Sequence, residues 1–394
     1  MSLLVISTHP VQYHAPVYRA LQQAFAIPTT VIYGSDFSIA GYRDREFGQS
    51  FSWDSDLLSG YQSIFLSRVS EGGAQSYETV MTKGLGKALS AQKFDAILLQ
   101  GYQPRFHLEA FGLSKRTGVP LLFRAETADI NIQRSNLKQL LRDNLLRLFY
   151  RQFARLLYIG QESRSHYLRL GCSDTKLIFS PYCVDTALFD NSDQTHTVER
   201  LKLRHELSIP ENKVVLLFSG KIVSRKAPDL LLEAVRLLPQ EQRDRLTLLF
   251  LGDGDQRVKL EAESQVEPFI DAYFVGFRNQ SEIGRYFHGA DILVLPSRNS
   301  ETWGLVVNEA LFHGLPCIVS DRVGSGADLI KPGLTGEIFA SDSAAGLAAA
   351  IERCALLLEQ PGTSNQCKAL VSRYSIEVAA QGIAKAYSEV TASA

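Results

Sequence analysis

Two glutamates in the second half of the chain have a spacing that could place them around one bound molecule. Glu301 lies in a polar loop after the apolar run Ile292–Leu295, and Glu309 lies eight residues later within the helical pattern Leu305–Phe312. Carboxylates bind paired hydroxyls, such as those of ribose and of sugars, through charge-assisted hydrogen bonds. Two surface acids on an ordinary strand–loop–helix would have the same spacing, so the pair alone is a weak signal.

The residues between the two glutamates could add hydrogen-bond donors. Trp303, Gly304, Leu305 and Val306 lie where the helix is expected to begin. The first N–H groups of a helix have no partner inside the helix, and its dipole places partial positive charge there. We therefore expect this loop to favour an anion or a sugar hydroxyl.

The segment from Ala290 to Ile338 resembles the retaining glycosyltransferases of the family 4 type. Their signature is a Glu, seven residues and a second Glu in the sequence context that surrounds Glu301 and Glu309 here. The resemblance is close over the second half of the chain and loose over the first. It implies that Glu309 binds the ribose hydroxyls of a nucleoside-diphosphate sugar and that Glu301 binds the hydroxyls of the sugar ring.

A basic loop follows the apolar run Val214–Ser219. Gly220 allows a tight turn, and Lys221 and Lys226 reach forward beside the expected start of a helix, which is a suitable place for a diphosphate. A solvated basic loop is the alternative. The loop looks like the Gly-Arg/Lys…Lys element that binds the donor diphosphate in the family, with Lys221 where arginine is usual. Lysine keeps the charge but loses the bidentate fork.

Two further strand ends carry turn residues, one around Gly252 and one around Phe277 and Arg278. In similar enzymes these loops cover the nucleobase of the donor. Phe277 could stack on a base or only pack against neighbouring side chains. A UDP-sugar is favoured over a GDP-sugar as the expected donor.

Two D-x-D triplets, 253–255 and 54–56, match the metal-carboxylate motif of the other major glycosyltransferase fold. Three-letter matches are common by chance, and the resemblance already explains the loop that contains Asp253. We expect no metal site and no cofactor beyond the nucleotide sugar, which is a co-substrate.

The first apolar run is followed directly by polar and aromatic residues, among them His9, Gln12, Tyr13 and His14. Relatives often carry a glycine-rich loop here that approaches the diphosphate, and this chain departs from that pattern. Histidines, an amide and a phenol at a strand end suit hydrogen bonding to an acceptor. The alternative is that one or both histidines cap the following helix. His14 is the better candidate for a functional role because it lies at the helix entry.

Relatives frequently place a histidine that contacts the donor sugar after the strand that ends here at Arg124, but this chain has none at that place. Arg124, Glu126 and Asp129 are the available substitutes, and we expect Glu126 to face the reacting centre. Tyr102 follows the preceding strand and could line the acceptor side. The expected catalytic residues are therefore Glu301, Glu126 and His14.

Short apolar runs alternate with longer amphipathic stretches along the chain, which is the pattern of repeated βα units and parallel sheets. The expected strands are Leu3–Ser7, Thr29–Tyr33, Ser63–Leu66, Ala96–Gln100, Leu121–Arg124, Leu156–Ile159, Leu177–Phe179, Val214–Ser219, Thr247–Leu251, Ala272–Val275, Ile292–Leu295, Cys317–Ser320 and Glu337–Phe339. The fold expected is α/β, with two doubly wound Rossmann-like domains facing a central cleft. This is the GT-B fold that the resemblance implies.

The expected domains are an acceptor-side domain at 1–188, a nucleotide-sugar-binding domain at 189–374 and a C-terminal helix at 375–394, which could cross back to the first domain. A polar stretch, Tyr182–Thr197, lacks periodicity and would suit a hinge. A chain of 394 residues is long enough for two domains of about 150–200 residues each.

The composition is that of an ordinary soluble protein, with 45% hydrophobic and 21% charged residues and a net charge of −1. A net charge near zero argues against a nucleic-acid partner. The five cysteines are scattered without a C-x-x-C pair, which suits reduced thiols in the cytoplasm. We see neither a signal peptide nor an apolar run of ~20 residues that could span a membrane.

One basic amphipathic stretch, 134–157, could contact an anionic membrane. A helix whose leucines face the core and whose basic side faces water is the commoner arrangement. The protein is expected in the cytoplasm, with the inner face of the membrane as a second location.

The expected function is transfer of a hexose from a nucleoside-diphosphate sugar to a hydroxyl of a glycan, a lipid or a small metabolite, with retained configuration and without a metal. No residue pair suits a double displacement, so attack on the same face, assisted by the leaving phosphate, is expected. The alternatives are a nucleotide-sugar epimerase, a phosphorylase, or a catalytically silent sugar-nucleotide-binding subunit, the last suggested by the missing histidine. No G-x-G-x-x-G follows an expected strand, which argues against a dinucleotide-dependent oxidoreductase.

Overall fold

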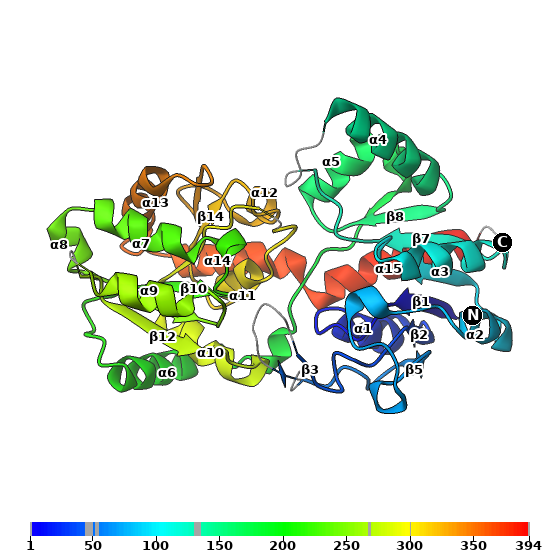
Figure 1. Cartoon of the computed structure of the whole chain (residues 1–394), viewed down its shortest axis with the longest axis horizontal. Helices are drawn as coiled ribbons and strands as arrows, with labels where there is room; N and C mark the ends of the chain where they lie inside the picture. The colour runs from blue at the N-terminus through cyan, green and yellow to red at the C-terminus, as the bar shows by residue number, and fades with distance from the viewer. Residues whose placement is uncertain are drawn as a thin grey trace.

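The computed structural model of the protein contains two parallel sheets, each covered by helices (Figure 1). The structure describes residues 2–43, 50–51, 55–129, 135–266, 269–299 and 301–392. The first sheet has the strand order β5-β2-β1-β6-β7-β8-β9, and the second has the order β12-β11-β10-β13-β14-β15. Every pairing within these two sheets is parallel.

The strands of the first sheet are β1 Leu3–Ser7, β2 Thr29–Tyr33, β5 Gln62–Phe65, β6 Ala96–Leu99, β7 Leu121–Arg124, β8 Arg155–Tyr158 and β9 Leu177–Phe179. Those of the second are β10 Val214–Ser219, β11 Leu246–Leu251, β12 Ala272–Gly276, β13 Ile292–Leu295, β14 Cys317–Ser320 and β15 Gly336–Phe339. The expected strands are confirmed, with ends that differ by no more than one residue. A short antiparallel pair, β3 Tyr42–Arg43 and β4 Ser50–Phe51, was not foreseen.

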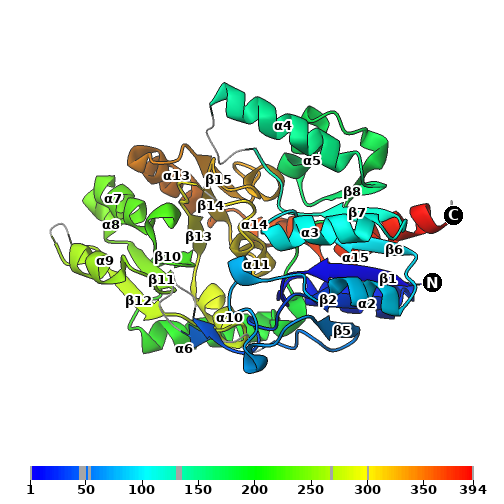
Figure 2. The ribbon, with the colours of Figure 1, turned by 45° about the vertical axis from the view of Figure 1, so that its right-hand side comes forward.

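The helices of the first half are α1 Ala15–Phe25, α2 Leu85–Ala91, α3 Arg105–Lys115, α4 Asn136–Tyr150 and α5 Gln161–Arg169. Those that follow are α6 Asp193–Glu206, α7 Pro228–Leu237, α8 Gln240–Arg243, α9 Arg257–Ser264, α10 Gln280–Gly289, α11 Val306–Phe312, α12 Gly326–Leu329, α13 Ala344–Leu357, α14 Thr363–Val371 and α15 Ile376–Thr391. Figure 2 shows the two sheets as separate halves of the molecule joined by α15.

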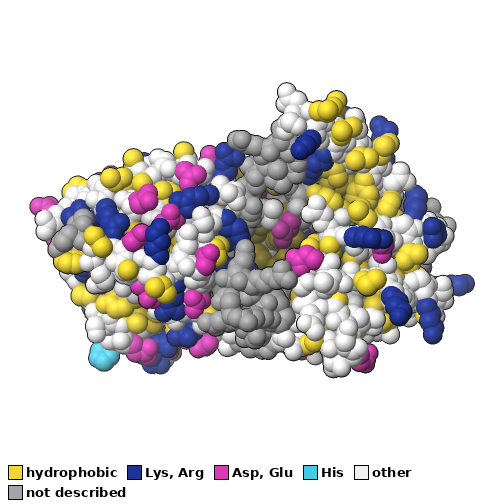
Figure 3. Space-filling model, in the orientation of Figure 1, with side chains coloured by type: hydrophobic (Ala, Val, Ile, Leu, Met, Phe, Trp, Pro, Cys, Tyr) yellow, Lys and Arg dark blue, Asp and Glu magenta, His cyan; other side chains and the backbone are white. Residues whose placement is uncertain are grey.

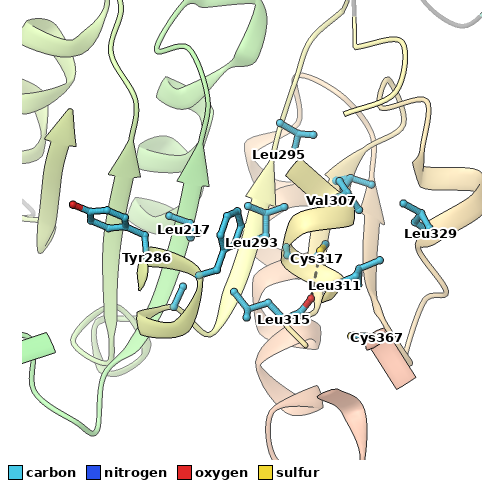
Figure 4. Close-up of a cluster of buried hydrophobic side chains, with 14 of the residues drawn as sticks. Leu217, Tyr286, Leu293, Leu295, Val307, Leu311, Leu315, Cys317, Leu329 and Cys367 are labelled. Atoms are coloured by element: carbon cyan, nitrogen blue, oxygen red, sulfur yellow. Dashed lines mark hydrogen bonds between the residues drawn. The ribbon is translucent and has the colours of Figure 1, made fainter. Parts of the chain in front are cut away.

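The core of the second half fixes the helix that carries Glu309. Leu293 of β13 and Val307 and Leu311 of α11 are fully buried in one cluster (Figure 4). Shortening a fully buried leucine such as Leu311 to alanine typically lowers the free energy of unfolding by about 2–5 kcal/mol. Because Val307 and Leu311 point into the core, Glu309 lies on a different side of the same helix.

The C-terminal helix α15 crosses back to the first half, as expected. It packs against α1, and its Ala379, Ala380 and Ile383 are fully buried in the same cluster as Leu3 of β1 (Figures 1 and 2). A Cβ at Gly382 would lie 2.0 Å from the carbonyl oxygen of Phe179, so only glycine fits where the helix meets β9. The chain therefore passes between its two halves twice, the second time through α15.

The basic stretch 134–157 forms a helix over only part of its length. Helix α4 ends at Tyr150, and Leu156 and Leu157 are fully buried in strand β8. The apolar run at this end is enclosed between two layers, which favours a strand over the exposed helix that its basic residues suggested. Arg134 lies outside the described residues. In the part of the chain that the structure describes, no helix is long and apolar enough to cross a membrane.

Candidate active site

Two cavities open where the parallel strands end. We call the first the N-terminal cavity, which has a volume of about 390 Å³ and is lined by residues that follow β1, β6 and β7. We call the second the C-terminal cavity, which has a volume of about 300 Å³ and is lined by residues that follow β10, β11 and β12. Thr302 from the second half lines the N-terminal cavity, and Gln12 from the first half lines the C-terminal cavity. Ligands of α/β proteins bind at this edge of the sheet.

Two glycine turns bring neighbouring loops together at the floor of the C-terminal cavity. Gly220 has φ 146° and Gly252 has φ 143°, values in the left-handed region that glycine tolerates. A Cβ at Gly252 would lie 1.9 Å from the carbonyl oxygen of Gly220, so a side chain there would separate the loops. The glycines expected from the sequence thus expose backbone to the cavity.

Glu309 lies at the cavity wall, with 8% of its surface exposed. Burial raises the pKa of its carboxyl to about 7, opposed only by a hydrogen bond donated by Gln280 Nε2 to Oε1 at 3.3 Å. Few protein groups donate hydrogen bonds to this carboxylate. It therefore gains hydrogen bonds when the paired hydroxyls of a ligand enter the cavity.

Glu301 and Lys226 form an ion pair across the same cavity. The Oε2 atom of Glu301 also accepts a hydrogen bond from Ser297 Oγ at 3.0 Å. Lys221 and Arg225 line the cavity as well, so three cations of one loop face it together with both glutamates. Arg225 was missed from the sequence, although its place between two expected site residues was a usable signal.

Of the remaining residues expected at the donor side, all but Trp303 line the C-terminal cavity. Phe277, Arg278, Gly304, Leu305 and Val306 line the C-terminal cavity. Arg278 is oriented by its Nε, which donates to the hydroxyl of Tyr286 at 2.9 Å.

Trp303 does not line either cavity. It is 3% exposed, and its Nε1 donates to Oδ1 of Asn308 at 2.9 Å. The large indole instead packs between the two halves beside Tyr182 and Tyr374. The sequence around a tryptophan such as Trp303 does not show whether its indole faces a ligand or the core.

The N-terminal cavity collects the residues expected at the acceptor side, with one exception. His9, Tyr13, His14, Tyr102 and Glu126 all line it. Gln12 lines the C-terminal cavity instead, since the loop after β1 passes between the two.

Glu126 joins the two halves of the molecule. Its Oε1 accepts a hydrogen bond from the hydroxyl of Tyr13 at 3.3 Å, and its Oε2 accepts one from Thr302 Oγ1. Burial, followed by the Glu126 carboxylate, raises the pKa of Tyr13 well above its usual value. Tyr13 therefore stays a hydrogen-bond donor to Glu126 at neutral pH.

The other two substitutes for the missing histidine are committed elsewhere. Arg124 is fully buried and donates to the carbonyl oxygens of Ser180 and Pro181 at 3.1 and 2.6 Å. Asp129 pairs with His166 and Arg169 at 2.9 and 2.8 Å. Of the three, Glu126 is the residue that lines a cavity.

His14 occupies the N-cap position of α1, but its side chain makes no capping hydrogen bond. The alternative role as a cap is therefore wrong for His14. Both of its ring nitrogens are buried without a hydrogen-bond partner, and burial and then the Arg124 cation hold its pKa well below the usual value. A neutral imidazole with two unused nitrogens at a cavity wall is suited to a ligand's hydroxyl.

Several cavity residues could not be singled out from the sequence because only the fold brings them together. In the N-terminal cavity these are Tyr77, His107, Tyr182 and Thr302, and in the C-terminal cavity they are Gln280 and Ile283. Of the two D-x-D triplets, Asp253 forms an ion pair with Arg257 at 3.2 Å, and Asp54 lies outside the described residues. The described residues include no group of three or more His, Cys, Asp or Glu side chains that could hold a metal ion.

Comparisons with known proteins agree with this geometry. Residues 199–388 match the family described as glycosyl transferases group 1. The chain is 32% identical over 202 residues to a D-inositol 3-phosphate glycosyltransferase of Geodermatophilus obscurus, which covers 49% of this chain and 43% of the relative. The chain thus matches less than half the length of this relative.

Solved structures resemble the whole chain. A sucrose-phosphate synthase of Thermosynechococcus elongatus superposes with a TM-score of 0.73 at 18% identity, covering 100% of both chains. Anabaena HepE in complex with UDP superposes with a TM-score of 0.71 at 18% identity, covering 99% of this chain and 100% of that one. The two-domain GT-B fold expected from the sequence is confirmed.

Proposed function

We propose that the protein is a retaining glycosyltransferase that moves a hexose from a nucleoside-diphosphate sugar to a hydroxyl acceptor without a metal ion. The observation that carries this proposal is the C-terminal cavity, where Glu301 and Glu309 face three cations of the loop after β10. The match to glycosyl transferases group 1 over this half and the UDP complex of one structural neighbour support it. A UDP-sugar is the favoured donor.

In this proposal the two glutamates and the two lysines of the cavity each have a defined task. Glu309 binds the ribose hydroxyls, and Glu301 binds hydroxyls of the sugar ring. Lys221 and Lys226 hold the diphosphate and stabilise the charge that grows on it as the glycosidic bond breaks. Lys226 and Glu301 form an ion pair with each other. When the donor binds, Lys226 would contact the diphosphate and Glu301 would contact the sugar ring.

The acceptor enters through the N-terminal cavity, with Glu126 and His14 at its wall. Attack occurs on the face that the diphosphate leaves, and the departing phosphate takes the proton of the attacking hydroxyl. Glu126 orients the acceptor near Thr302, where the two cavities approach each other. Nothing in this course needs a divalent ion, because the lysines already supply positive charge beside the leaving group.

A panel of UDP-, GDP- and ADP-sugars tests the proposal through release of nucleoside diphosphate, with and without a mixture of hydroxyl acceptors. Release that depends on a sugar nucleotide and rises with acceptor is the expected result. An epimerase would convert the donor without releasing nucleoside diphosphate. A silent binding subunit would bind a donor, raising the melting temperature by mass action, without turnover.

A second part of the proposal concerns α4, which we infer lies on an anionic membrane surface. Five of its six leucines do not face the core, contrary to the commoner arrangement considered from the sequence, whereas Leu146 is buried. The exposed fractions are 67% for Leu137, 55% for Leu140, 57% for Leu141, 69% for Leu145 and 58% for Leu148. Hydrophobic and basic side chains gather over this part of the molecule (Figure 3).

The charges beside these leucines favour anionic lipid as the occupant. Lys138 and Arg151 are exposed on and just after α4, and Arg147 is partly exposed. The acid of the helix, Asp143, is buried and paired with Arg169. A helix with leucines toward the acyl boundary and cations at the headgroups binds such surfaces. This would bring the protein to the cytoplasmic face of the membrane.

Vesicle flotation tests this contact with phosphatidylcholine alone and with phosphatidylserine added. Binding should require the anionic lipid, weaken with salt, and fall at least about tenfold in a Leu141→Ser, Leu145→Ser double variant. Leu237→Ser on α7, where the leucine is 60% exposed, is the matched control. The same low recovery with both vesicle types at low salt would contradict the contact.

A further inference from the structure

The wall of the N-terminal cavity differs from that of its neighbour in carrying almost no charge. Its described lining residues include one carboxylate, Glu126, and neither lysine nor arginine. The other titratable groups at the wall are three histidines and four tyrosines: His9, His14, His107, Tyr13, Tyr77, Tyr102 and Tyr182. A charged group on a ligand would therefore face only side chains that are uncharged or negatively charged.

The three histidines are neutral near pH 7. Burial is the largest cause in each case, and it lowers the pKa of His9 and of His107 to about 4. His14 has its pKa lowered well below the usual value by burial and by Arg124. Arg124 is fully buried and is not among the lining residues; its Nε and Nη2 donate to backbone carbonyl oxygens, and its Nη1 is buried without a hydrogen-bond partner.

One of these histidines is fixed as a hydrogen-bond acceptor. His107 is 3% exposed, and its Nδ1 lies 2.6 Å from the carbonyl oxygen of Gln103. A carbonyl oxygen can only accept, so in the neutral ring Nδ1 carries the proton and Nε2 has none. That Nε2 is buried without a partner, as are both nitrogens of His14. A ligand hydroxyl can donate to Nε2 of His107, whereas a fully ionised phosphate cannot.

We propose that the N-terminal cavity binds a neutral polyhydroxylated moiety, a sugar or polyol ring without a phosphate. The hydroxyls would pair with the buried imidazole nitrogens, and the tyrosine rings would cover the apolar face of the ring. A phosphate here would lie beside the Glu126 carboxylate, with no lysine or arginine among the described lining residues to offset its desolvation. This inference rests on the proposed function, since it names the class of acceptor for the same reaction.

Matched acceptor pairs test the inference with full-length protein and the donor identified by the sugar-nucleotide panel. Suitable pairs are myo-inositol with inositol 3-phosphate, and methyl hexosides with their 6-phosphates. We expect kcat/KM for the neutral member to be at least about tenfold higher in each pair that supports transfer. Preference for the phosphorylated member, or turnover of the donor with transfer to none of the neutral members, would overturn the inference. Failure of the proposed function is distinct, because no sugar nucleotide would then be turned over.

The fixed tautomer of His107 gives a sharper test. His107→Phe removes the acceptor nitrogen while filling the space, and the KM for the neutral acceptor should rise about tenfold, more than the KM for the donor. His107→Gln places an acceptor oxygen near Nε2 and should recover part of that affinity. His196→Phe, in the second half outside both cavities, is the control. An unchanged acceptor KM in a folded His107→Phe protein, judged by its melting temperature, would overturn the inference.

Discussion

The two cavities lie at equivalent edges of two similar sheets, yet their walls are built from different chemistry. The C-terminal cavity combines Lys221, Arg225 and Lys226 with two carboxylates, whereas the N-terminal cavity combines aromatic rings and uncharged imidazoles with Glu126. A diphosphate needs cations and a turn of exposed backbone whatever sugar it carries. A hydroxyl acceptor needs a fitted shape and neutral hydrogen-bonding groups, which many different side chains can supply. The same fold can therefore carry a highly charged cavity at one sheet and a nearly uncharged cavity at the other.

The largest expected effect comes from removing a cation of the C-terminal cavity. Lys226→Ala should lower kcat about 10²–10³-fold, comparable to the loss of one preorganised group that stabilises developing charge. The variant also leaves the Glu301 carboxylate without its ion-pair partner. Initial rates at saturating donor measure the effect, and Lys385→Ala, an exposed lysine of α15, is the control. Turnover within a few-fold of the wild type would mean that the basic loop is only a solvated surface.

The next effect separates the two cavities from each other. Glu126→Ala should reduce transfer about 10–100-fold while slow hydrolysis of the donor falls less, because the C-terminal cavity still holds the nucleotide. The estimate corresponds to about 1.4–2.7 kcal/mol of lost transition-state stabilisation. His14→Ala should show the same selectivity. Equal loss of transfer and hydrolysis in both variants would instead assign the two residues to the donor or to folding.

A third prediction concerns the buried carboxyl of Glu309. Burial raises its pKa from the ordinary 4.5 to about 7 in the folded protein, so its contribution to stability is full below pH 4.5 and is lost as pH rises through 7. This loss amounts to roughly 3 kcal/mol at most, from about 1.4 kcal/mol per unit of pKa. Denaturant unfolding at several pH values should show the decline in the wild type.

Glu309→Gln should remove this decline between pH 4.5 and 7 and raise the KM for the donor about tenfold. The amide keeps the shape of the side chain but loses the charge that binds paired hydroxyls. Identical pH dependence in the variant and the wild type would show that Glu309 is not the buried titrating group.

The smallest expected effect is that of a chelator. Activity should remain within about twofold in excess EDTA, because Lys221 and Lys226 already neutralise the leaving diphosphate. The ion pair between Asp253 and Arg257 occupies one D-x-D carboxylate. An absolute requirement for manganese or magnesium, restored on adding the metal back, would contradict this. It would mean that the lysines of the C-terminal cavity do not suffice to neutralise the leaving diphosphate.

The strands and the lysine and glutamate positions could be predicted because each depends on local sequence. Runs such as Val214–Ser219 are apolar, short and bounded by turn residues, and they form buried parallel strands whatever surrounds them. Lys226 and Glu301 are expected at one cavity because each follows a strand of the same sheet, at its carboxyl edge.

The rest depended on contacts between distant segments. Trp303 turns into the interface of the two halves, and Thr302 reaches Glu126 across it, neither of which a local pattern contains. The leucines of α4 repeat at helical spacing, but the sequence does not say whether another layer covers them. The neutral state of His107 likewise follows from its burial, and the tautomer of its ring follows from one carbonyl oxygen.

Anomeric configuration of the product tests the central claim most directly. The donor from the sugar-nucleotide panel is incubated with a neutral acceptor, and proton NMR follows the anomeric signal while nucleoside diphosphate is quantified in the same sample. We predict one nucleoside diphosphate for each glycoside formed, with the anomeric configuration of the donor retained. An inverted product, or conversion of the donor without release of nucleoside diphosphate, would contradict the account.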